Sequence, residues 1–467
     1  MAVTSLFDPS GIAVVGASAT PGKIGYEAMR NAVEFDGPVY PVNPSAEGSV
    51  FDREFVPSVT DIEDDDVDLA LLCVPAPVVP DVVAECGEAG IGGAVIFAGG
   101  FAEAGEEGER LQERLVEAAT EGDVHLLGPN TSGFLRPAEN LYATFATDVD
   151  RIPAGNVAVI AQSGGLAYAV AFHAENEGLG VSAMVGLGNR ANVGFEEAIE
   201  HFDSDEHTDA ILLHVEGTDD ARGLLETCRA AETPIVAYNV GEQDVGDFAE
   251  SHTGALTGRY ELYEAGFAQY GVPTVRSVAE LLDAGTALAT CPRPDGPNVG
   301  VVTAQAGPGI AITDRLKAAG AKFPTLADET RETVEEILPG MTYSANPVDT
   351  GRPMPAFGDV VAAVARDENV DVVVVYELYE GAIGYPVDAL EGLVAEVDKP
   401  IVFATGGPDA VIRDELADLE ALGIPTYRTP ERGADAVAAL VQYALRNAEP
   451  EAIADDGDAV ADEGVSR

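Results

Sequence analysis

The stretch IAVVGASATPGKIG, residues 12–25, decides the fold. Its apolar residues predict a short buried strand, its glycines a turn, and the residues after them a helix. The same order returns in NVAVIAQSGGL (156–166) and NVGVVTAQAGPGI (298–310), which share the pattern N-V-x-V-[IV]. Strands that alternate with helices indicate parallel sheets covered by helices on both faces. We therefore expect an α/β protein with three consecutive doubly wound domains, the last two being diverged copies of one fold.

Interruptions in this pattern mark the expected domain boundaries. Pro, Gly and charged residues replace the periodic pattern near residues 148–155 and 291–297. The predicted domains are therefore 1–148, 153–290 and 297–447, which agrees with a length of 467 residues at roughly 150 residues per domain. The acidic stretch 448–467 lacks apolar periodicity and is predicted to be a disordered tail.

The composition disfavours several classes of function. The chain has 81 acidic and 25 basic residues, a formal net charge of −56, which argues against binding to nucleic acid or to an anionic membrane. No apolar run is long enough for a membrane helix, and the N-terminal residues lack a basic region, so we expect a soluble, cytoplasmic protein. The four cysteines are far apart, which argues against a metal site. The scarcity of Lys and the dispersed acidic residues indicate adaptation to high salt.

The first glycine-rich turn predicts a site for a phosphate-bearing ligand. It contains Gly16, Ser18, Pro21 and Lys23 and leads into a helix whose first N–H groups can bind a phosphate. It is not a Walker A loop, because five residues rather than four separate its glycines and Ile follows the Lys. Asn43 follows the second strand, where an NAD-binding fold has an acid for the ribose. A ligand other than NAD is therefore expected, with a purely structural turn as the alternative.

Two further segments of the first domain end strands at the edge where open α/β sheets bind ligands. Val74, Pro75 and Pro77 follow the strand DLALLCV and form a rigid rim suited to an adenine or a pantetheine arm. Asn130 lies in GPNTSG after the fifth strand. Ordinary turn chemistry is the alternative explanation for each Pro and Gly taken separately.

The middle domain contains a histidine among small residues, His252 in ESHTGALTG. Glu216 ends the strand DAILLHVEG, and a carboxylate there can fix a histidine tautomer and leave Nε2 as a nucleophile. Ser163, Gly164 and Gly165 begin the first helix of this domain and can hold a phosphoryl group on their N–H groups. These residues together predict a phosphohistidine site. The alternatives are a structural role for His252 and a surface or helix-capping role for Glu216, and the other five histidines are interpreted as structural or surface residues.

These motifs resemble, in their order, those of the α subunits of ADP-forming acyl-CoA synthetases such as acetate–CoA ligase, relatives of succinyl-CoA synthetase. The resemblance covers about residues 8–445 and includes GASATPGKIGYE, VYPVNP, LLGPNTSG, AQSGGL and SHTGALTG. It implies a Rossmann-like CoA-binding domain followed by two flavodoxin-like ligase domains. It also implies that His252 is phosphorylated, that Glu216 orients it, and that the helix start at Ser163 holds the phosphate.

The resemblance further implies the reaction acyl-CoA + phosphate + ADP ⇌ acid + CoA + ATP, through an acyl phosphate and a phosphohistidine. Few residues follow the third domain, so ADP, ATP and Mg²⁺ are expected on a separate ATP-grasp β subunit, in a hetero-oligomer. The residues implied to bind CoA are Gly16, Ser18, Pro21, Lys23, Asn43, Val74, Pro75, Pro77 and Asn130.

Three departures from the family pattern keep other functions open. Asn192 and Gly194 stand where acids are common, Thr131 stands where Cys is usual, and the segment before His252 lacks basic residues. Arg190 and Arg259 are the candidates to balance the charge of the phosphate. The main alternative is a CoA-binding or regulatory module without turnover. A dinucleotide-dependent oxidoreductase is a weaker one, because the chain lacks the NAD fingerprint.

Overall fold

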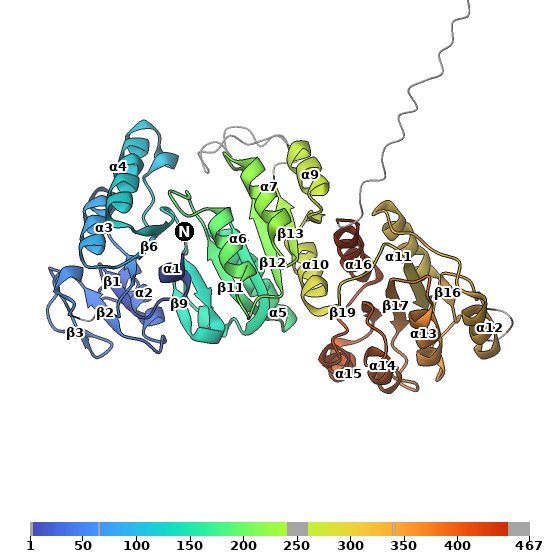
Figure 1. The fold of residues 1–467 in the computed structure, drawn as a ribbon. Helices are drawn as coiled ribbons and strands as arrows, with labels where there is room; N and C mark the ends of the chain where they lie inside the picture. The colour runs from blue at the N-terminus through green and yellow to red at the C-terminus, as the bar shows by residue number, and fades with distance from the viewer. Residues whose placement is uncertain (1–2, 64–65, 241–259, 339, 341, 447–467) are drawn as a thin grey trace, which may run out of the picture.

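The structure, a computed structural model, describes residues 3–63, 66–240, 260–338, 340 and 342–446. Three α/β units follow one another along the chain and lie side by side in Figure 1, running from blue through green to red. His252, Arg259 and the acidic tail lie outside the described residues. Within the described ranges, no helix has both the length and the apolar character that crossing a membrane requires.

The first unit contains a parallel sheet of five strands in the order β2–β1–β5–β6–β7. Valine and leucine runs form these strands because the sheet is covered on both faces, and all four residues of β1 are buried. The strands are β1 (Ile12–Val15), β2 (Val39–Val42), β5 (Leu69–Leu72), β6 (Gly93–Ile96) and β7 (His125–Leu127). The helices are α1 (Thr4–Phe7), α2 (Ile24–Ala32), α3 (Val79–Glu88) and α4 (Glu106–Gly122), and β3 (Ser49–Val50) and β4 (Arg53–Glu54) form a separate hairpin.

The second unit contains a sheet of seven strands in the order β14–β13–β12–β10–β11–β8–β9. Five of them are parallel, and β8 and β9 extend the sheet in antiparallel fashion beside β11. The strands are β8 (Phe134–Arg136), β9 (Leu141–Ala143), β10 (Ala154–Ala161), β11 (Val181–Gly186), β12 (Ala210–Val215), β13 (Ile235–Asn239) and β14 (Thr274–Val275). The helices are α5 (Gly164–Glu177), α6 (Phe195–Asp203), α7 (Ala221–Ala230), α9 (Tyr260–Gln269) and α10 (Val278–Thr290).

The third unit repeats the parallel part of the second, with the strand order β16–β15–β17–β18–β19. In all three units the first parallel strand lies between the second and the third parallel strands, an order that places a ligand-binding crevice beside the first one. The predicted α/β class and the alternation of strands and helices are confirmed. The strands are β15 (Val299–Thr303), β16 (Val348–Asp349), β17 (Val372–Leu378), β18 (Ile401–Gly406) and β19 (Thr426–Tyr427), and the helices are α11 (Ala306–Ala318), α12 (Asp328–Ile337), α13 (Phe357–Arg366), α14 (Val387–Val394), α15 (Asp409–Ala421) and α16 (Pro430–Leu445).

Two strands on the first-domain side of the predicted boundary at residue 148 belong to the second sheet. Strands β8 and β9 precede residue 148, yet β8 pairs with β11 of the second sheet, through Met184 with Leu135 and Val185 with Phe134, and β9 pairs with β8. The Pro, Gly and charged residues at 148–155 form a 3₁₀ turn, Val149–Arg151, and the entry into β10 within the second unit. These residues therefore connect β9 to β10 within the second sheet.

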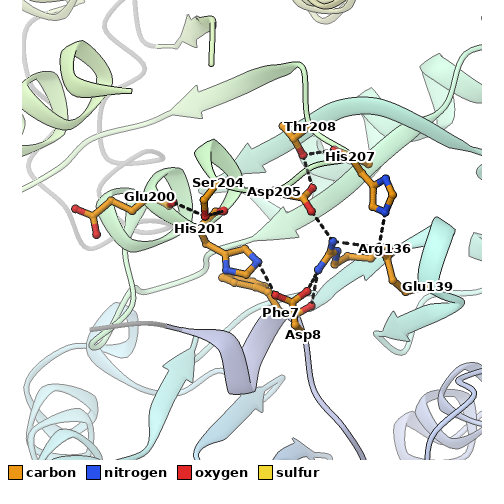
Figure 2. A network of polar contacts seen from close by, with 11 residues as sticks. Phe7, Asp8, Arg136, Glu139, Glu200, His201, Ser204, Asp205, His207 and Thr208 are labelled. Atoms are coloured by element: carbon orange, nitrogen blue, oxygen red, sulfur yellow. Dashed lines mark hydrogen bonds and ion pairs between the residues drawn. The ribbon is translucent and has the colours of Figure 1, made fainter. Parts of the chain in front are cut away.

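A buried arginine fastens the start of the chain to the second unit. Figure 2 shows Arg136 of β8 among the carboxylates of Asp8, Glu139 and Asp205. Its guanidinium pairs with Asp205 at 2.8 Å and with Glu139 at 3.1 Å, and it also pairs with Asp8. It donates a further hydrogen bond of 3.1 Å to the carbonyl of Phe7 in α1. Since α1 also packs against β6 and β7, this network holds the first two units together.

The second and third units share a hydrophobic core in which α10 packs against α16. Arg432 of α16 pairs with Asp283 of α10 at 2.7 Å, and Tyr427 donates a hydrogen bond of 2.8 Å to the Asp283 carbonyl. Asp283 is buried, so its pairing with arginine offsets the cost of burying a charge. The third unit is therefore joined to the second by packed side chains as well as by the connecting chain.

Candidate active site

A cavity of about 270 Å³ lies where the carboxyl ends of strands from the first and second sheets meet. The segment after β7 contributes Asn130 and the start of α5 contributes Ser163, Gly164 and Gly165. Glu216, which directly follows β12, completes this group. The structure thus brings together five predicted site residues that lie between residues 130 and 216 of the sequence.

The helix start at Ser163 is built to present backbone N–H groups to the cavity. Ser163 is the N-cap of α5, and its hydroxyl accepts a hydrogen bond from the N–H of Leu166 at 3.4 Å. The remaining N–H groups of a first helical turn lack partners within the helix, so they are available to an anion. Gly164 has to be glycine, because a Cβ there would collide with the side chain of Ser132. The close packing leaves the Ser132 Oγ buried without a hydrogen-bond partner among the described residues.

Glu216 is held in place by Gln162. The Gln162 side chain is buried, and its Oε1 accepts hydrogen bonds from the N–H groups of Glu216 at 3.1 Å and of Gly217 at 3.2 Å. Its backbone N–H donates to the carbonyl of His214 at 3.1 Å. Gln162 therefore connects the ends of β10 and β12 and fixes the backbone that carries the carboxylate.

The loop after β11 joins the two units around the cavity. Asn189 donates hydrogen bonds to Glu103 at 2.5 Å and to Gln112 at 3.1 Å, both in the first unit. Asn192 accepts a hydrogen bond from the N–H of Leu126 at 2.7 Å and donates one to the carbonyl of Val124 at 3.0 Å. A carboxylate at residue 192 could not donate that second bond, which explains why an amide suits this position.

Arg190 is a weak candidate to balance the charge of a phosphate in this cavity. Its guanidinium lies over the ring of Phe195, 5.2 Å from the centroid, and burial lowers its pKa while Asp219 and Glu196 oppose that effect. The described residues that line the cavity include no Lys or Arg. Among these residues, the groups suited to hold an anion are therefore backbone N–H groups and the polar side chains of Asn130 and Ser163.

The remaining predicted residues that the structure describes in the first unit lie at the carboxyl edge of the first sheet, not in the cavity. Gly16 has a positive φ of 84°, and a Cβ there would meet the Cys73 carbonyl, so the turn after β1 requires glycine. Asn43 donates a hydrogen bond to the Ala17 carbonyl at 2.8 Å and thereby holds the same turn. The Ser18 hydroxyl accepts a hydrogen bond from the Thr20 N–H at 3.1 Å. Ser18 and Asn43 are therefore used at least in part to shape the turn.

The exposed residues of this edge flank the crevice between β1 and β5. Pro21 and Lys23 are exposed in the turn after β1, and Pro75 and Pro77 are exposed in the segment after β5. Val74 is half-buried beside them. A ligand that lies across the carboxyl ends of these neighbouring strands can touch both segments.

Several lining residues of the cavity were not singled out from the sequence. The largest are the aromatic residues Phe97 and Phe145, and the polar ones include Ser132, Gln162 and Asn189. Phe97 directly follows β6, so its place at a carboxyl strand end is a signal in the sequence. Phe145 follows the antiparallel strand β9, whose position beside the cavity depends on how the two units pack.

Comparison with known proteins identifies two domains in the chain and its relatives. Residues 10–137 match the model of a CoA binding domain, and residues 154–288 match that of a succinyl-CoA ligase like flavodoxin domain. The chain is 36% identical over 452 residues to the α subunit of acetate–CoA ligase [ADP-forming] II of Pyrococcus furiosus, covering 94% of this chain and 97% of the relative. It is 31% identical to a trans-feruloyl-CoA synthase from an unidentified prokaryote, covering 95% of this chain and 65% of the relative.

A solved structure extends the similarity to the whole fold. It is a dinucleotide forming acetyl-coenzyme A synthetase 1 of Ca. Korarchaeum cryptofilum in complex with phosphate and ADP, which superposes with a TM-score of 0.85 at 33% identity. The match covers 95% of this chain and 97% of the other. Domain models, full-length identity and full-length superposition agree, and the chain belongs to the family of α subunits of ADP-forming acetate–CoA ligases, with succinyl-CoA ligase-like domains.

Proposed function

We propose that this α subunit catalyses the first two steps of acyl-CoA + phosphate + ADP ⇌ acid + CoA + ATP at the cavity described above. The observation that supports this most directly is the convergence of the α5 helix start and Glu216 with Asn130 of the first unit. A phosphate held at the helix start would lie next to the part of the first unit where a bound CoA would end. CoA and phosphate then meet at one site between the two units.

The proposed chemistry has three balanced steps. A phosphate oxygen attacks the thioester carbonyl, the C–S bond breaks, and CoA leaves with a proton as an acyl phosphate forms. Nε2 of His252 then attacks phosphorus, the bond from phosphorus to the acyl oxygen breaks, and the carboxylate leaves. Finally an oxygen of ADP attacks the phosphohistidine, the N–P bond breaks, and ATP forms. The structure describes no residue of the segment that carries His252, so its role is an inference from the motif SHTGALTG.

Within this scheme, Glu216 accepts the Nδ1–H of His252 and so fixes the tautomer in which Nε2 is the nucleophile. Gln162 keeps the Glu216 backbone in place. ADP and Mg²⁺ are assigned to an ATP-grasp β subunit, as expected for the α component of a two-component ligase. Gly16, Pro21, Lys23, Val74, Pro75 and Pro77 are assigned to CoA.

A labelling experiment tests the proposal. The chain is incubated with acetyl-CoA and ³²P-phosphate in molar KCl, and label that is stable in base and lost in acid is measured. We expect one label per active chain, loss of the label in His252→Ala, and an unchanged label in His207→Ala, because His207 is an exposed histidine remote from the cavity. Label that persists in His252→Ala would refute the assignment.

A non-catalytic CoA-binding module is the second candidate, since the described lining of the cavity lacks basic side chains. Titration calorimetry with acetyl-CoA separates it from the enzyme. Tight binding of acetyl-CoA without any label, with a β subunit present at high salt, would favour the regulatory module.

A further inference from the structure

Two aromatic rings form the apolar part of the proposed active-site cavity. Phe97 follows β6 of the first sheet, and Phe145 follows β9 of the second. Their ring centroids are 5.1 Å apart and their planes are inclined by 84°, an edge-to-face arrangement that stabilises an aromatic pair. The pair therefore joins the two units at the cavity and presents it with an apolar wall.

Hydrogen bonds on both sides fix the backbone that carries Phe145. Asn31 of α2 donates to the carbonyls of Thr144 and Ala146, each at 2.8 Å. The Thr144 hydroxyl donates to the carbonyl of Ser132 at 2.7 Å and also bonds the hydroxyl of Tyr168 in α5. The residues before and after Phe145 are thus tied to three other segments, so the ring is held rather than free to swing away.

The ring of Phe97 is also held in place. Its side chain is 8% exposed, and its ring packs so closely against Gly133 that a Cβ there would lie 3.1 Å from Cε1 of Phe97. The ring is thus packed against the turn after β7, which also carries Asn130 and Ser132. The wall is therefore pre-formed, as is usual for small-molecule sites.

We propose that Phe97 and Phe145 pack against the acyl group of the substrate and restrict this enzyme to short aliphatic acids. This inference rests on the proposed function of the cavity. The other lining residues are glycines or polar residues, and they suit the phosphate and the reacting carbonyl; the polar ones include Asn130, Gln162, Ser163, Asn189 and Glu216. The two rings are the large apolar side chains among the described lining residues, so they are the surface that an acyl chain would contact.

The size of the cavity sets the class of acid. Sites for drug-sized ligands span about 300–1,000 Å³, whereas this cavity of about 270 Å³ has to receive a phosphate as well as the acyl group. We expect an acetyl or butyryl chain to fit beside a phosphate in such a space. An aryl acid such as ferulate would need one of the two fixed rings to move.

The test compares acids within each enzyme preparation. The full chain is combined with its ATP-grasp β subunit, and kcat/KM is measured for acetate, butyrate and ferulate in the acyl-CoA-forming direction. Wild type is expected to favour acetate over ferulate by about 100-fold or more, the discrimination that shape in an apolar pocket can supply. Phe145→Ala is expected to reduce this acetate-to-ferulate ratio about tenfold or more. Phe97→Leu is expected to raise kcat/KM for butyrate relative to that for acetate. A ratio within one preparation does not depend on the fraction of folded enzyme.

Phe323→Ala is the matched control, because Phe323 is a half-buried ring of the third unit that packs beside Lys317, remote from the cavity. Its ratios should equal those of wild type. Wild-type turnover with ratios unchanged in both Phe97→Leu and Phe145→Ala would overturn the aromatic wall and leave the proposed function intact. A wild-type preference for ferulate would also overturn it. The absence of turnover with every acid would overturn the proposed function and this inference with it.

Discussion

The Oε1 atom of Gln162 accepts a hydrogen bond from the backbone N–H of Glu216 at 3.1 Å. Gln305 repeats this arrangement in the third unit, where its Oε1 accepts a hydrogen bond from the N–H of Leu378 at 3.2 Å. Each glutamine follows the first parallel strand of its sheet, β10 or β15, and holds the backbone at the end of the third, β12 or β17. The two related units therefore keep the brace, and only in the second unit does it position a carboxylate.

This pair of glutamines supplies a matched comparison. Gln162→Leu removes the acceptor that holds Glu216, and a small displacement of a catalytic group can cost up to about 100-fold in rate. We expect the rate of phosphohistidine formation to fall about ten- to a hundredfold. Gln305→Leu removes the same kind of bond and is expected to leave that rate unchanged. An equal loss of rate in both variants would show that the brace matters for folding rather than for the position of Glu216.

The contact between Gly164 and Ser132 predicts a second-site rescue. Gly164→Ala places a methyl group against the Ser132 side chain at the phosphate-binding helix start. Such overpacking costs typically about 1–3 kcal/mol of unfolding free energy, which urea denaturation in high salt would measure. The double variant Gly164→Ala/Ser132→Gly removes the colliding side chain and should recover much of that loss.

Gly165 provides the control for this helix start. A Cβ at Gly165 would meet only the Ser163 Oγ, at 3.9 Å, an ordinary contact distance. Gly165→Ala should therefore leave the unfolding free energy near or above that of wild type, since alanine favours a helix. A large loss in Gly165→Ala, or no rescue in the double variant, would argue against a steric origin.

The sequence predicts the three sheets because each begins with a buried apolar strand and a glycine-rich turn. It also predicts that Ser163 and Glu216 share a sheet edge, since both follow parallel strands of one unit. It does not predict the wall of the cavity. Phe145 reaches the site only because β8 and β9 join the second sheet, and Asn189 is held there by contacts with the first unit. Contacts between units depend on side chains far apart in the sequence, which periodicity does not encode.

The half-buried histidine beside Arg136, His201, is expected to make the protein sensitive to acid. Burial and the charge of Arg136 lower the pKa of His201 to about 4, with Asp205 opposing them, from about 6.5 in an unfolded chain. The unfolded chain therefore binds more protons between these values, and stability falls as the pH drops from about 6.5 to 4. At pH 5 this residue should cost about 2 kcal/mol relative to pH 7.5.

His201→Phe tests this expectation, because the new ring can pack against Phe7 and Phe202 as the imidazole does. Asp8 also faces His201, and its interaction with the ring is lost in the variant. The difference in unfolding free energy between pH 7.5 and pH 5, measured in constant molar KCl, should shrink in His201→Phe. His207→Gln should keep the full wild-type difference. A difference that is the same in His201→Phe and in wild type would mean that His201 is charged in the folded protein.

Glu377, at the end of β17, is buried with 1% of its surface exposed, and burial together with Glu415 and Glu380 raises its pKa to about 8. The folded chain holds a proton there that an unfolded glutamate releases above about pH 4.5, so stability is lost as the pH rises through this window. Glu377→Gln should therefore raise the unfolding free energy at pH 8, relative to pH 5, by on the order of 3 kcal/mol. The control is Glu391→Gln at an exposed position, which should change the unfolding free energy by the same amount at pH 8 and at pH 5. A gain that is independent of pH would mean that Glu377 is ionised when folded.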